Sequence, residues 1–381
     1  MRIAGDWLDH PGTQALCAAL EAAGFQALLV GGCVRNALLG RQVSDLDLAT
    51  DATPETVARI AEAAGFRVVP TGLVHGTVTV IARHRPHEVT TFRRDVETFG
   101  RHATVAYSTD ITEDAARRDF TMNALYSDWR GEVIDPLGGL PDLLSGHVRF
   151  VGDANDRIQE DYLRILRFFR FYAHFGTDGI DAEGLAACAA HSAMIETISR
   201  ERVGAEMKKL LSAPDPAPAL AAMAQAGVLV QVLPGADARG VAVLVHLEQD
   251  VPPDPLRRLA GLAGQEGGQD VAERLRLSRK EAATLDALRA ALSSDETAAV
   301  LGWKHGADRA RDAVLLRAAL SGQPVPQAQA EIDRGTRAKF PIKPADLPLE
   351  GPALGNALRE MQARWIASDL RLSRGALLGH E

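Results

Sequence analysis

Residues 28–49, LLVGGCVRNALLGRQVSDLDLA, constrain the fold of this chain most: an apolar strand runs into a double glycine and a short helix, and a second strand carries two aspartates. Alternate side chains of a strand lie on one face, so Asp45 and Asp47 point the same way while Leu46 and Leu48 are buried. Two carboxylates this close repel one another unless a divalent cation lies between them, and hard oxygen ligands suit magnesium. The pair is therefore predicted to hold metal ions for phosphoryl or nucleotidyl transfer.

The double glycine provides the place for phosphates. Gly31 and Gly32 have no Cβ, so a polyanion can approach the backbone amides where a helix is expected to begin, near Val34. Arg35 would lie in the first turn of that helix, within reach of the same phosphates. Either piece alone is more simply a tight turn or a surface aspartate pair. Their joint spacing indicates a nucleotide site.

Length and composition allow a substantial core. At 381 residues and 46% hydrophobic, the chain is long enough for two or three domains. No apolar run approaches the roughly 20 residues that span a membrane, and the first residues, MRIAGDWLDHPG, lack a basic and then apolar leader. We expect a cytoplasmic protein with no membrane contact. Cys17, Cys33 and Cys188 are scattered and are expected to fill the core, with no disulfide or zinc site.

The net charge of -8 is not typical of a nucleic-acid binder, whose phosphate contacts usually require a basic face. A net charge is only a sum, however. Basic residues are concentrated in three segments, 149–170, 200–209 and 334–343. The acidic excess can lie elsewhere, so local basic surfaces remain compatible with RNA binding.

The pattern along the chain changes from mixed to helical. Thr53 followed by proline predicts a helix start, and that helix should end at Gly65. Strands are predicted at 78–82 and 88–92, separated by the turn RHRPH, and the polar stretch 93–112 is interpreted as a long loop. From about residue 154 the pattern is almost entirely helical. These features predict a mixed α/β head with a long helical remainder.

Two further segments carry unusual charges. Arg117, Arg118 and Asp119 precede an apolar helical pattern, where they are either a charged helix start or a recognition site for phosphate and ribose. In RIQEDYLRILRFFRF, an aspartate and three arginines recur every three residues along a predicted helix: Asp161, Arg164, Arg167 and Arg170. A solvated amphipathic helix with Asp161 paired to Arg164 is the simpler interpretation. An aspartate and an arginine one turn apart can also offer an acceptor and planar donors to the edge of a base.

These motifs together resemble those of the class II CCA-adding enzymes, tRNA nucleotidyltransferases that share a head-domain superfamily with bacterial poly(A) polymerases. The resemblance runs in order through about the first 210 residues, in LVGGCVRNALLG, DLDLAT, GLVHGTVTV, EVTTFRRD, RRDFTMNAL, DPLGGLPDL, EDYLRILRFFRF and ISRERVGAEM. It implies an α+β fold with a polymerase-β-like nucleotidyltransferase head (1–148, core 25–148), a helical neck with a base-reading helix (149–212), and a helical body and tail that bind tRNA (213–381).

The resemblance also implies residue roles. Asp45 and Asp47 would be the catalytic ligands of Mg²⁺, with Glu88 a weaker third candidate, and Gly32 and Arg35 would contact the triphosphate. Arg118, beside Asp119, would check for a ribose. The remaining implied nucleotide contacts are Asp161 and Arg164, which would pair with the incoming base, and Arg167 and Arg170.

The implied activity is addition of CCA to the 3′ end of tRNA from CTP and ATP, without a nucleic-acid template and with release of pyrophosphate. No obligate protein partner is expected. The alternatives are a poly(A) polymerase, an enzyme that adds only the two cytidines or only the adenosine, and a non-catalytic RNA-binding module. The paired aspartates argue against the last of these. A Rossmann-type enzyme fails because the glycines follow a GGxxR pattern.

The sequence departs from the family pattern in places. Asn36 stands where the family usually has aspartate, which removes a charge beside Arg35, and no His-Asp dipeptide of an appended phosphohydrolase domain occurs. Beyond about residue 215 only residues 351–370 are similar, and they are expected to form a pair of tail helices with Trp365 packed inside.

Overall fold

The computed structural model describes residues 1–70, 72, 76–99, 102–248, 251–264, 267–322 and 328–379. The chain divides into two compact units. Unit 1 comprises Met1–Ile198 and Gln225–Gln231, and unit 2 comprises Ser199–Ala224 and Val232–Glu381. Every described strand lies in unit 1, and the described elements of unit 2 are helices. The predicted α+β class, a head with a sheet followed by a helical remainder, is therefore confirmed.

A seven-stranded sheet organises the head. Its strand order is β3-β4-β5-β2-β1-β8-β9, in which β2 and β5 are parallel and the other neighbours are antiparallel. The predicted mixed sheet is confirmed. The strands are β1 (Leu28–Val30), β2 (Asp47–Thr50), β3 (Arg67–Val69), β4 (Thr77–Ala82), β5 (Arg85–Thr91), β8 (Tyr126–Asp128) and β9 (Val133–Ile134).

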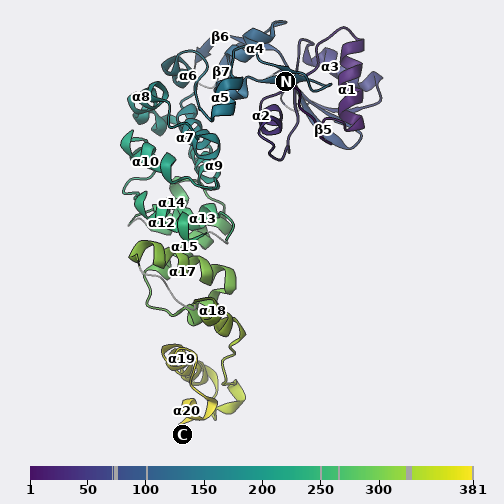
Figure 1. The fold of residues 1–381 in the computed structure, drawn as a ribbon. Helices are drawn as coiled ribbons and strands as arrows, with labels where there is room; N and C mark the ends of the chain where they lie inside the picture. The colour runs from purple at the N-terminus through teal and green to yellow at the C-terminus, as the bar shows by residue number, and fades with distance from the viewer. Residues whose placement is uncertain are drawn as a thin grey trace. The chain divides into compact units, whose positions relative to one another are not determined.

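Two helices, α1 (Pro11–Ala22) and α3 (Pro54–Ala63), cover one face of this sheet (Figure 1). Leu48 of β2 is fully buried in the core cluster that these helices share with β4 and β5. Because side chains alternate along a strand, Asp47 faces the opposite side of the sheet. The Thr53 hydroxyl accepts a hydrogen bond from the Thr56 amide, so the predicted helix start is confirmed.

The predicted loop 93–112 is wrong. The chain there forms a two-stranded sheet of β6 (Arg93–Phe99) and β7 (His102–Tyr107), followed by α4 (Ile111–Ala116). The pairing register shifts between Asp95 and Glu97, which is a β-bulge or similar irregularity. A bulge interrupts the two-residue alternation that identifies a strand in a sequence, so the sequence did not predict these two strands.

Three boundaries also differ from those expected. Helix α2 (Gly32–Leu38) begins at Gly32 and not near Val34. The turn between β4 and β5 contains only Arg83 and His84, both with positive φ (49° and 68°), so β5 starts earlier than predicted. Two central residues with positive φ are typical of the tight turns that join twisted antiparallel strands. The helical pattern after Asp119 yields only a three-ten helix, Thr121–Asn123, before β8.

The helical part of unit 1 breaks at Asp161. Helix α6 (Ala154–Glu160) ends there, because Asp161 has extended backbone angles (φ -154°, ψ 105°), and α7 (Leu163–Phe175) begins two residues later. The predicted continuous helix through Asp161 is therefore wrong. The other helices of this part are α5 (Leu140–Ser145), α8 (Ala182–Ala190) and the three-ten helix Ser192–Thr197.

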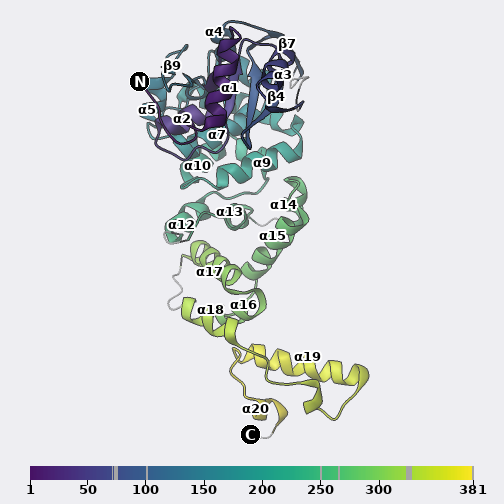
Figure 2. The same ribbon diagram turned by 90° about the vertical axis from the view of Figure 1, so that its right-hand side faces the viewer.

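Unit 2 is built from short helices (Figure 2). Its helices and those at the unit boundary are α9 (Arg200–Leu211), α10 (Ala217–Gln225), α11 (Val228–Val232), α12 (Arg239–Leu247), α13 (Pro255–Leu262), α14 (Gly268–Arg274), α15 (Arg279–Leu292), α16 (Ala298–His305), α17 (Ala307–Ser321), α18 (Ala328–Arg337), α19 (Gly351–Ala367) and α20 (Arg374–Leu378), with a three-ten helix at Pro344–Asp346.

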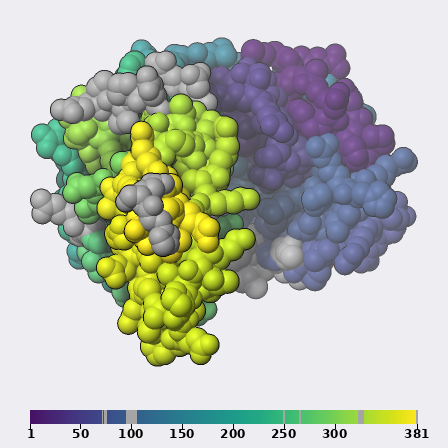
Figure 3. All heavy atoms as spheres, turned by 90° about the horizontal axis from the view of Figure 1, so that it is seen from below, coloured from purple at the N-terminus to yellow at the C-terminus, as the bar shows by residue number. Residues whose placement is uncertain are grey.

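Trp365 is buried at the C-terminal end of unit 2, where its ring contacts Trp303 and Phe340. This burial is as predicted, but residues 351–367 form one helix and not a pair. Residues of this end are coloured yellow-green to yellow in the space-filling view (Figure 3). In the described part of the chain, no helix is both long and apolar enough to cross a membrane. Three cysteines, Cys17, Cys33 and Cys188, are buried and unpaired, as expected.

Candidate active site

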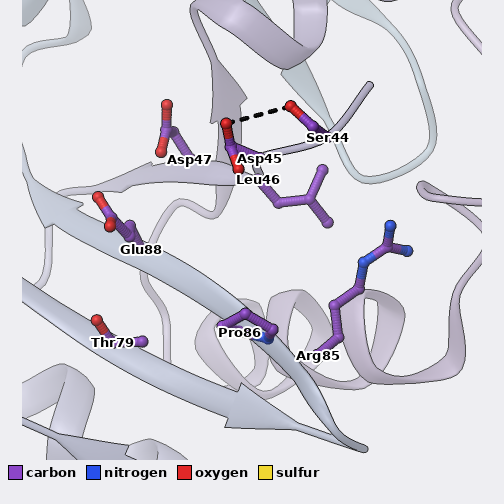
Figure 4. Close-up of a pocket in the computed structure, with 8 residues that line it drawn as sticks. All are labelled: Ser44, Asp45, Leu46, Asp47, Thr79, Arg85, Pro86 and Glu88. Carbon is purple, nitrogen blue, oxygen red and sulfur yellow. Dashed lines mark hydrogen bonds between the residues drawn. The ribbon is translucent and has the colours of Figure 1, made fainter. Parts of the chain in front are cut away.

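An acidic cavity of about 360 Å³ lies where β2 and β5 run side by side. Asp47 of β2 is the direct neighbour of Glu88 of β5 in the parallel register, and Thr79 of β4 lies opposite Glu88. Asp45, just before β2, lines the same cavity (Figure 4). The structure thus brings together both predicted metal ligands and the weaker third candidate. The other lining residues are Ser44, Leu46, Arg85 and Pro86.

The carboxylates of this cavity differ in environment. Asp45 is exposed and accepts a hydrogen bond of 3.1 Å from the Ser44 hydroxyl. Asp47 is partly buried, and burial raises its pKa, as do the carboxylates of Glu88 and Asp45, against the opposing effect of Arg118. A cation bound between such carboxylates would relieve their repulsion. A set of three carboxylates without nitrogen or sulfur ligands fits a hard divalent ion.

The described residues contain no group of three acidic, histidine or cysteine side chains that lie close enough together to hold an ion by themselves. Asp45 and Asp47 would therefore share a metal ion with other oxygen ligands, such as those of a bound phosphate. That arrangement is usual for magnesium, which keeps several ligands from water or substrate.

The guanidinium groups of Arg118 and Arg35 lie close to the double glycine. Gly31 has a φ of +70°, and a Cβ on it would meet Arg118 Nη1 at 3.6 Å. A Cβ on Gly32 would meet Arg35 Nη2 at 3.9 Å. Larger residues here would narrow the space between the turn and the arginines. The turn therefore places backbone and two cations around one position, which suits a phosphate group.

Arg118 is held by a buried carboxylate and a tyrosine. Its Nη2 donates to Asp114 at 2.9 Å and its Nε donates to the Tyr126 hydroxyl at 3.0 Å, and that hydroxyl donates to Asp114 at 2.7 Å. Burial alone would raise the pKa of Asp114, but Arg118 and Arg117 outweigh it and lower the pKa to about 2. The carboxylate therefore stays charged, and it fixes the direction of the Arg118 guanidinium.

A second chain of contacts links the head to α7. Arg167 of α7 is paired with the buried Asp119, which also accepts a hydrogen bond of 3.0 Å from Asn123. Asn123 in turn accepts one of 2.6 Å from Arg35 Nη1. Burial lowers the pKa of Arg35 to about 10, and the neighbouring Arg170 contributes to this shift. Arg167 and Asp119, both expected near the nucleotide, thus serve at least to orient Arg35.

Asp161 and Arg164 lie at the break between α6 and α7. The Asp161 carboxylate accepts a hydrogen bond of 3.1 Å from the Leu163 amide and so caps the start of α7. The Arg164 guanidinium pairs with Glu160 and donates to the carbonyl oxygens of Arg157 (2.8 Å) and Arg117 (3.3 Å). Arg164 thus has partners besides the Asp161 that the sequence suggested. They connect Arg164 to the segment that carries Arg118.

Sequence reasoning missed three polar residues of this site, Asp114, Asn123 and Tyr126. Asp114 could have been found, because it lies in α4 three and four residues before Arg117 and Arg118, which follow the end of that helix at the spacing of side-chain ion pairs. Asn123 and Tyr126 have no such signal, since their contacts depend on tertiary structure. The motif GLVHGTVTV lies partly outside the described residues, at positions 73–75.

Comparisons with family models and with curated relatives indicate the same kind of domain as this geometry does. A model described as the poly A polymerase head domain matches residues 27–149, which contain the acidic cavity and the double glycine. Curated relatives that share this region are named CCA tRNA nucleotidyltransferase 1, mitochondrial (Homo sapiens, 44% identical over 186 residues) and CCA-adding enzyme (Bacillus pumilus, 43% over 194 residues). Over this region the chain is therefore similar to tRNA nucleotidyltransferases and to the head domain of poly A polymerases.

The similarity to these proteins is uneven along the chain. The two alignments cover 48% and 50% of this chain, and 43% and 47% of the relatives, so they span just under half of the curated relatives' length. A second model, described as the probable RNA and SrmB-binding site of polymerase A, matches residues 179–239. CCA-adding nucleotidyltransferases generally depend on divalent metal ions, and the acidic cavity is consistent with such an ion.

Solved structures extend the likeness to the whole chain. A Bacillus stearothermophilus CCA-adding enzyme in complex with CTP is 28% identical, with a TM-score of 0.70, and the match covers 94% of each chain. A Thermotoga maritima CCA-adding enzyme complexed with tRNA is 18% identical, with a TM-score of 0.69, covering 96% of this chain and 93% of that one. At that identity the second match establishes the shared fold alone.

Proposed function

We propose that this protein adds CCA to the 3′ end of tRNA, using CTP and ATP and no nucleic-acid template, with Mg²⁺ as its metal ion and in the cytoplasm. The observation that carries the proposal is the acidic cavity lined by Asp45, just before β2, and by Asp47 of β2, in the same compact unit as the double glycine, Arg118 and the α6–α7 break. The names of the relatives, CCA-adding enzyme among them, support the same activity.

In this mechanism the 3′ hydroxyl of tRNA loses its proton to water and attacks the α-phosphorus of a bound nucleotide. The bond between the α-phosphorus and the oxygen that bridges it to the β-phosphorus breaks, and that oxygen leaves with pyrophosphate. Asp45 and Asp47 would hold the metal, which when bound stabilises negative charge on the attacking and leaving oxygens. The turn at Gly31 and Gly32 leaves room for the triphosphate, and Arg35 donates hydrogen bonds to it.

Arg118 would bind on the ribose side of the nucleotide. Its Nε and Nη2 are occupied by Tyr126 and Asp114, so the guanidinium is oriented before the nucleotide arrives. Prior orientation reduces the entropy lost on binding and therefore favours a precise position of the sugar. A deoxyribose lacks the hydroxyl that this arginine would recognise.

Base selection would be carried out by Asp161 and Arg164. A site that hydrogen-bonds the edge of cytosine or adenine rejects other bases because they leave buried polar groups unpaired. The carbonyl contacts of Arg164 hold its guanidinium at the start of α7, next to Asp161. The protein side chains would thus replace a nucleic-acid template.

The decisive experiment incubates the protein with three tRNAs, which end before, within and after the CCA sequence, in the presence of CTP and ATP. We expect the first to gain CCA, the second to be completed and the third to remain unchanged, as read by sequencing the products. A run of adenosines would identify a poly(A) polymerase, and addition of only CC or only A would identify a partial enzyme. Absence of pyrophosphate release with magnesium would contradict the proposal.

A further inference from the structure

The end of helix α2 is closed by a turn that involves Asn36. The backbone oxygen of Asn36 accepts a hydrogen bond of 2.8 Å from the Arg41 amide, and the Ala37 oxygen accepts one of 3.1 Å from the Gly40 amide. Gly40 has a φ of +64°, the left-handed conformation required at this position of a Schellman motif. The turn therefore brings Arg41 back to the last turn of α2, beside Asn36.

The Asn36 side chain makes two hydrogen bonds of opposite kind. Its Oδ1 accepts from Nε and Nη2 of Arg35 at 3.2 and 2.9 Å, and its Nδ2 donates to the Gln42 carbonyl at 3.1 Å. A guanidinium can only donate and a carbonyl can only accept, so the orientation of the amide is determined by its partners. A carboxylate at position 36 would retain the bonds to Arg35 but would have no donor for Gln42.

Both arginines tied to Asn36 lie against the same aromatic ring. The Cζ atoms of Arg35 and Arg41 lie 4.3 and 4.7 Å from the ring centroid of Phe175, near the C-terminal end of α7. Arg170 adds a third guanidinium, at 4.4 Å from the Phe171 ring centroid. Among the charged neighbours that influence the pKa of Arg35, Asp119 is negative, whereas Arg41, Arg167 and Arg170 are positive. The cluster carries excess positive charge, which a bound polyanion would neutralise.

Arg35 has donors to spare for such an anion. Its guanidinium donates two hydrogen bonds to Asn36 and one to Asn123, and a guanidinium carries five N–H groups. Arg41 is exposed, and its stacking on Phe175 leaves the edge of the guanidinium available. The neutral amide of Asn36 orients Arg35 without neutralising its charge, which a carboxylate would do.

We propose that Arg41 is a second phosphate-binding guanidinium beside Arg35, for the polyphosphate of the incoming nucleotide. Asn36 is then the positioning residue, which orients Arg35 directly and steadies the turn that carries Arg41 through the Gln42 carbonyl. The assignment of the ligand to a nucleoside triphosphate rests on the proposed function. Binding of a polyphosphate by this cluster does not require catalysis and can be measured by itself.

The test measures binding of inorganic tripolyphosphate, CTP and cytidine to the full chain by calorimetry. Asn36→Asp should weaken tripolyphosphate and CTP at least about tenfold, because it loses the bond to Gln42 and adds a negative charge beside Arg35. Arg41→Ala should weaken both at least about fivefold, since one charged contact is lost. Cytidine binding should change less than twofold in either variant. In steady-state assays the KM for CTP and for ATP should rise while kcat is nearly unchanged.

Gln42→Ala is the matched control, because it removes an exposed side chain and keeps the carbonyl that Asn36 uses; its affinities should match those of the wild type. Arg41 is exposed, so its variant tests the proposal even where Asn36→Asp lowers the melting temperature. Wild-type affinity for tripolyphosphate in a folded Asn36→Asp or in Arg41→Ala would overturn the proposal. A protein that shows the expected binding losses but adds no CCA would refute the proposed function alone.

Discussion

Asp45 and Asp47 are held on one edge of the acidic cavity by the buried leucines between and after them, Leu46 and Leu48. The core therefore fixes the position of both aspartates, and their own side chains contribute little to the stability of the fold. Replacing either aspartate with alanine should leave the fold intact and lower CMP and AMP incorporation at least about a thousandfold, because a metal contributes several kcal/mol to charge stabilisation. tRNA affinity should change little. Radiolabelled incorporation and a filter-binding assay measure the two effects.

The control for this pair is Glu62→Ala, which removes an exposed carboxylate from α3 on the other face of the sheet. Its incorporation rate should equal that of the wild type. Activity above one tenth of the wild-type rate in the variants of Asp45 and Asp47 would rule out their role as metal ligands.

Asp161 has two roles that alanine would remove together, since its carboxylate caps α7 through the Leu163 amide. Asp161→Asn separates them, because an amide oxygen can still accept that hydrogen bond while the group now also carries donors. We expect the preference for CTP and ATP over UTP and GTP to fall by about tenfold or more, as competition assays with the four nucleotides would show. Asp153→Asn, at the capped start of α6, is the control and should keep the preference. Unchanged selectivity in Asp161→Asn would exclude it as a base reader.

At the scale of elements, the sequence predicted what depends on local pattern. The strand before the double glycine, the capped helix α3 and the buried face of β2 follow from the spacing of apolar residues and from capping chemistry. The β6–β7 hairpin and the break at Asp161 were not predictable in this way. In the β6–β7 hairpin, the register shift interrupts the alternation of side chains that is typical of a strand. At Asp161, charged residues spaced every three positions predict a continuous helix although the chain breaks there.

The same division applies to the candidate site. Asp45, Asp47 and Glu88 line the cavity, and Arg35 and Arg118 lie beside the glycine turn. The pairing of Arg167 with Asp119 joins residues 48 positions apart. No periodicity within α7 could have selected that partner among the acidic residues of the chain.

The packing of α1 on the sheet depends on His87. This histidine is fully buried on β5, with Nε2 2.9 Å from the hydroxyl of Thr13 in α1 and Nδ1 3.1 Å from the Arg85 carbonyl oxygen. Burial lowers the pKa of His87 from 6.5 to about 4. The unfolded chain therefore takes up a proton at higher pH than the folded one. This contribution to stability is complete above about pH 6.5 and is lost as the pH falls toward 4.

Between pH 7 and pH 5 the wild type should lose about 2 kcal/mol more folding free energy than His87→Gln, which cannot titrate. Urea unfolding at both pH values, followed by circular dichroism, measures the difference. His84→Asn is the control, because His84 is exposed in the turn before β5 and asparagine tolerates its positive φ. Equal losses in the wild type and His87→Gln would show that His87 is not buried in its neutral form.

At the scale of the whole molecule, a chain with a net charge of -8 must collect a polyanion in the proposed function. A basic cavity of about 530 Å³ in unit 2 provides one place for phosphate contacts; it is lined by Ala330, Arg334, Arg337, Ala338, Leu370 and Arg371. Arg334 is paired with Glu331 and Asp369. Arg337 and Arg371 also lie 3.9 and 3.3 Å from the carboxylates of Asp333 and Asp369, but their side chains are 80% and 68% exposed. The two exposed arginines are the better candidates for contacts with RNA.

Each phosphate contact releases condensed counterions, so the logarithm of the tRNA affinity should fall linearly with the logarithm of the salt concentration. Replacing Arg337 and Arg371 together with alanine should reduce the magnitude of that slope by about two, with weaker binding at low salt and a smaller difference at high salt. Arg239→Ala in the same unit is the control, because Arg239 is highly exposed but is paired with Asp237 outside this cavity. An unchanged slope in the double variant would place the phosphate contacts on other basic segments, of which residues 200–209 are the next to test. A wild-type affinity that does not depend on salt would instead contradict electrostatic capture of tRNA by this acidic chain.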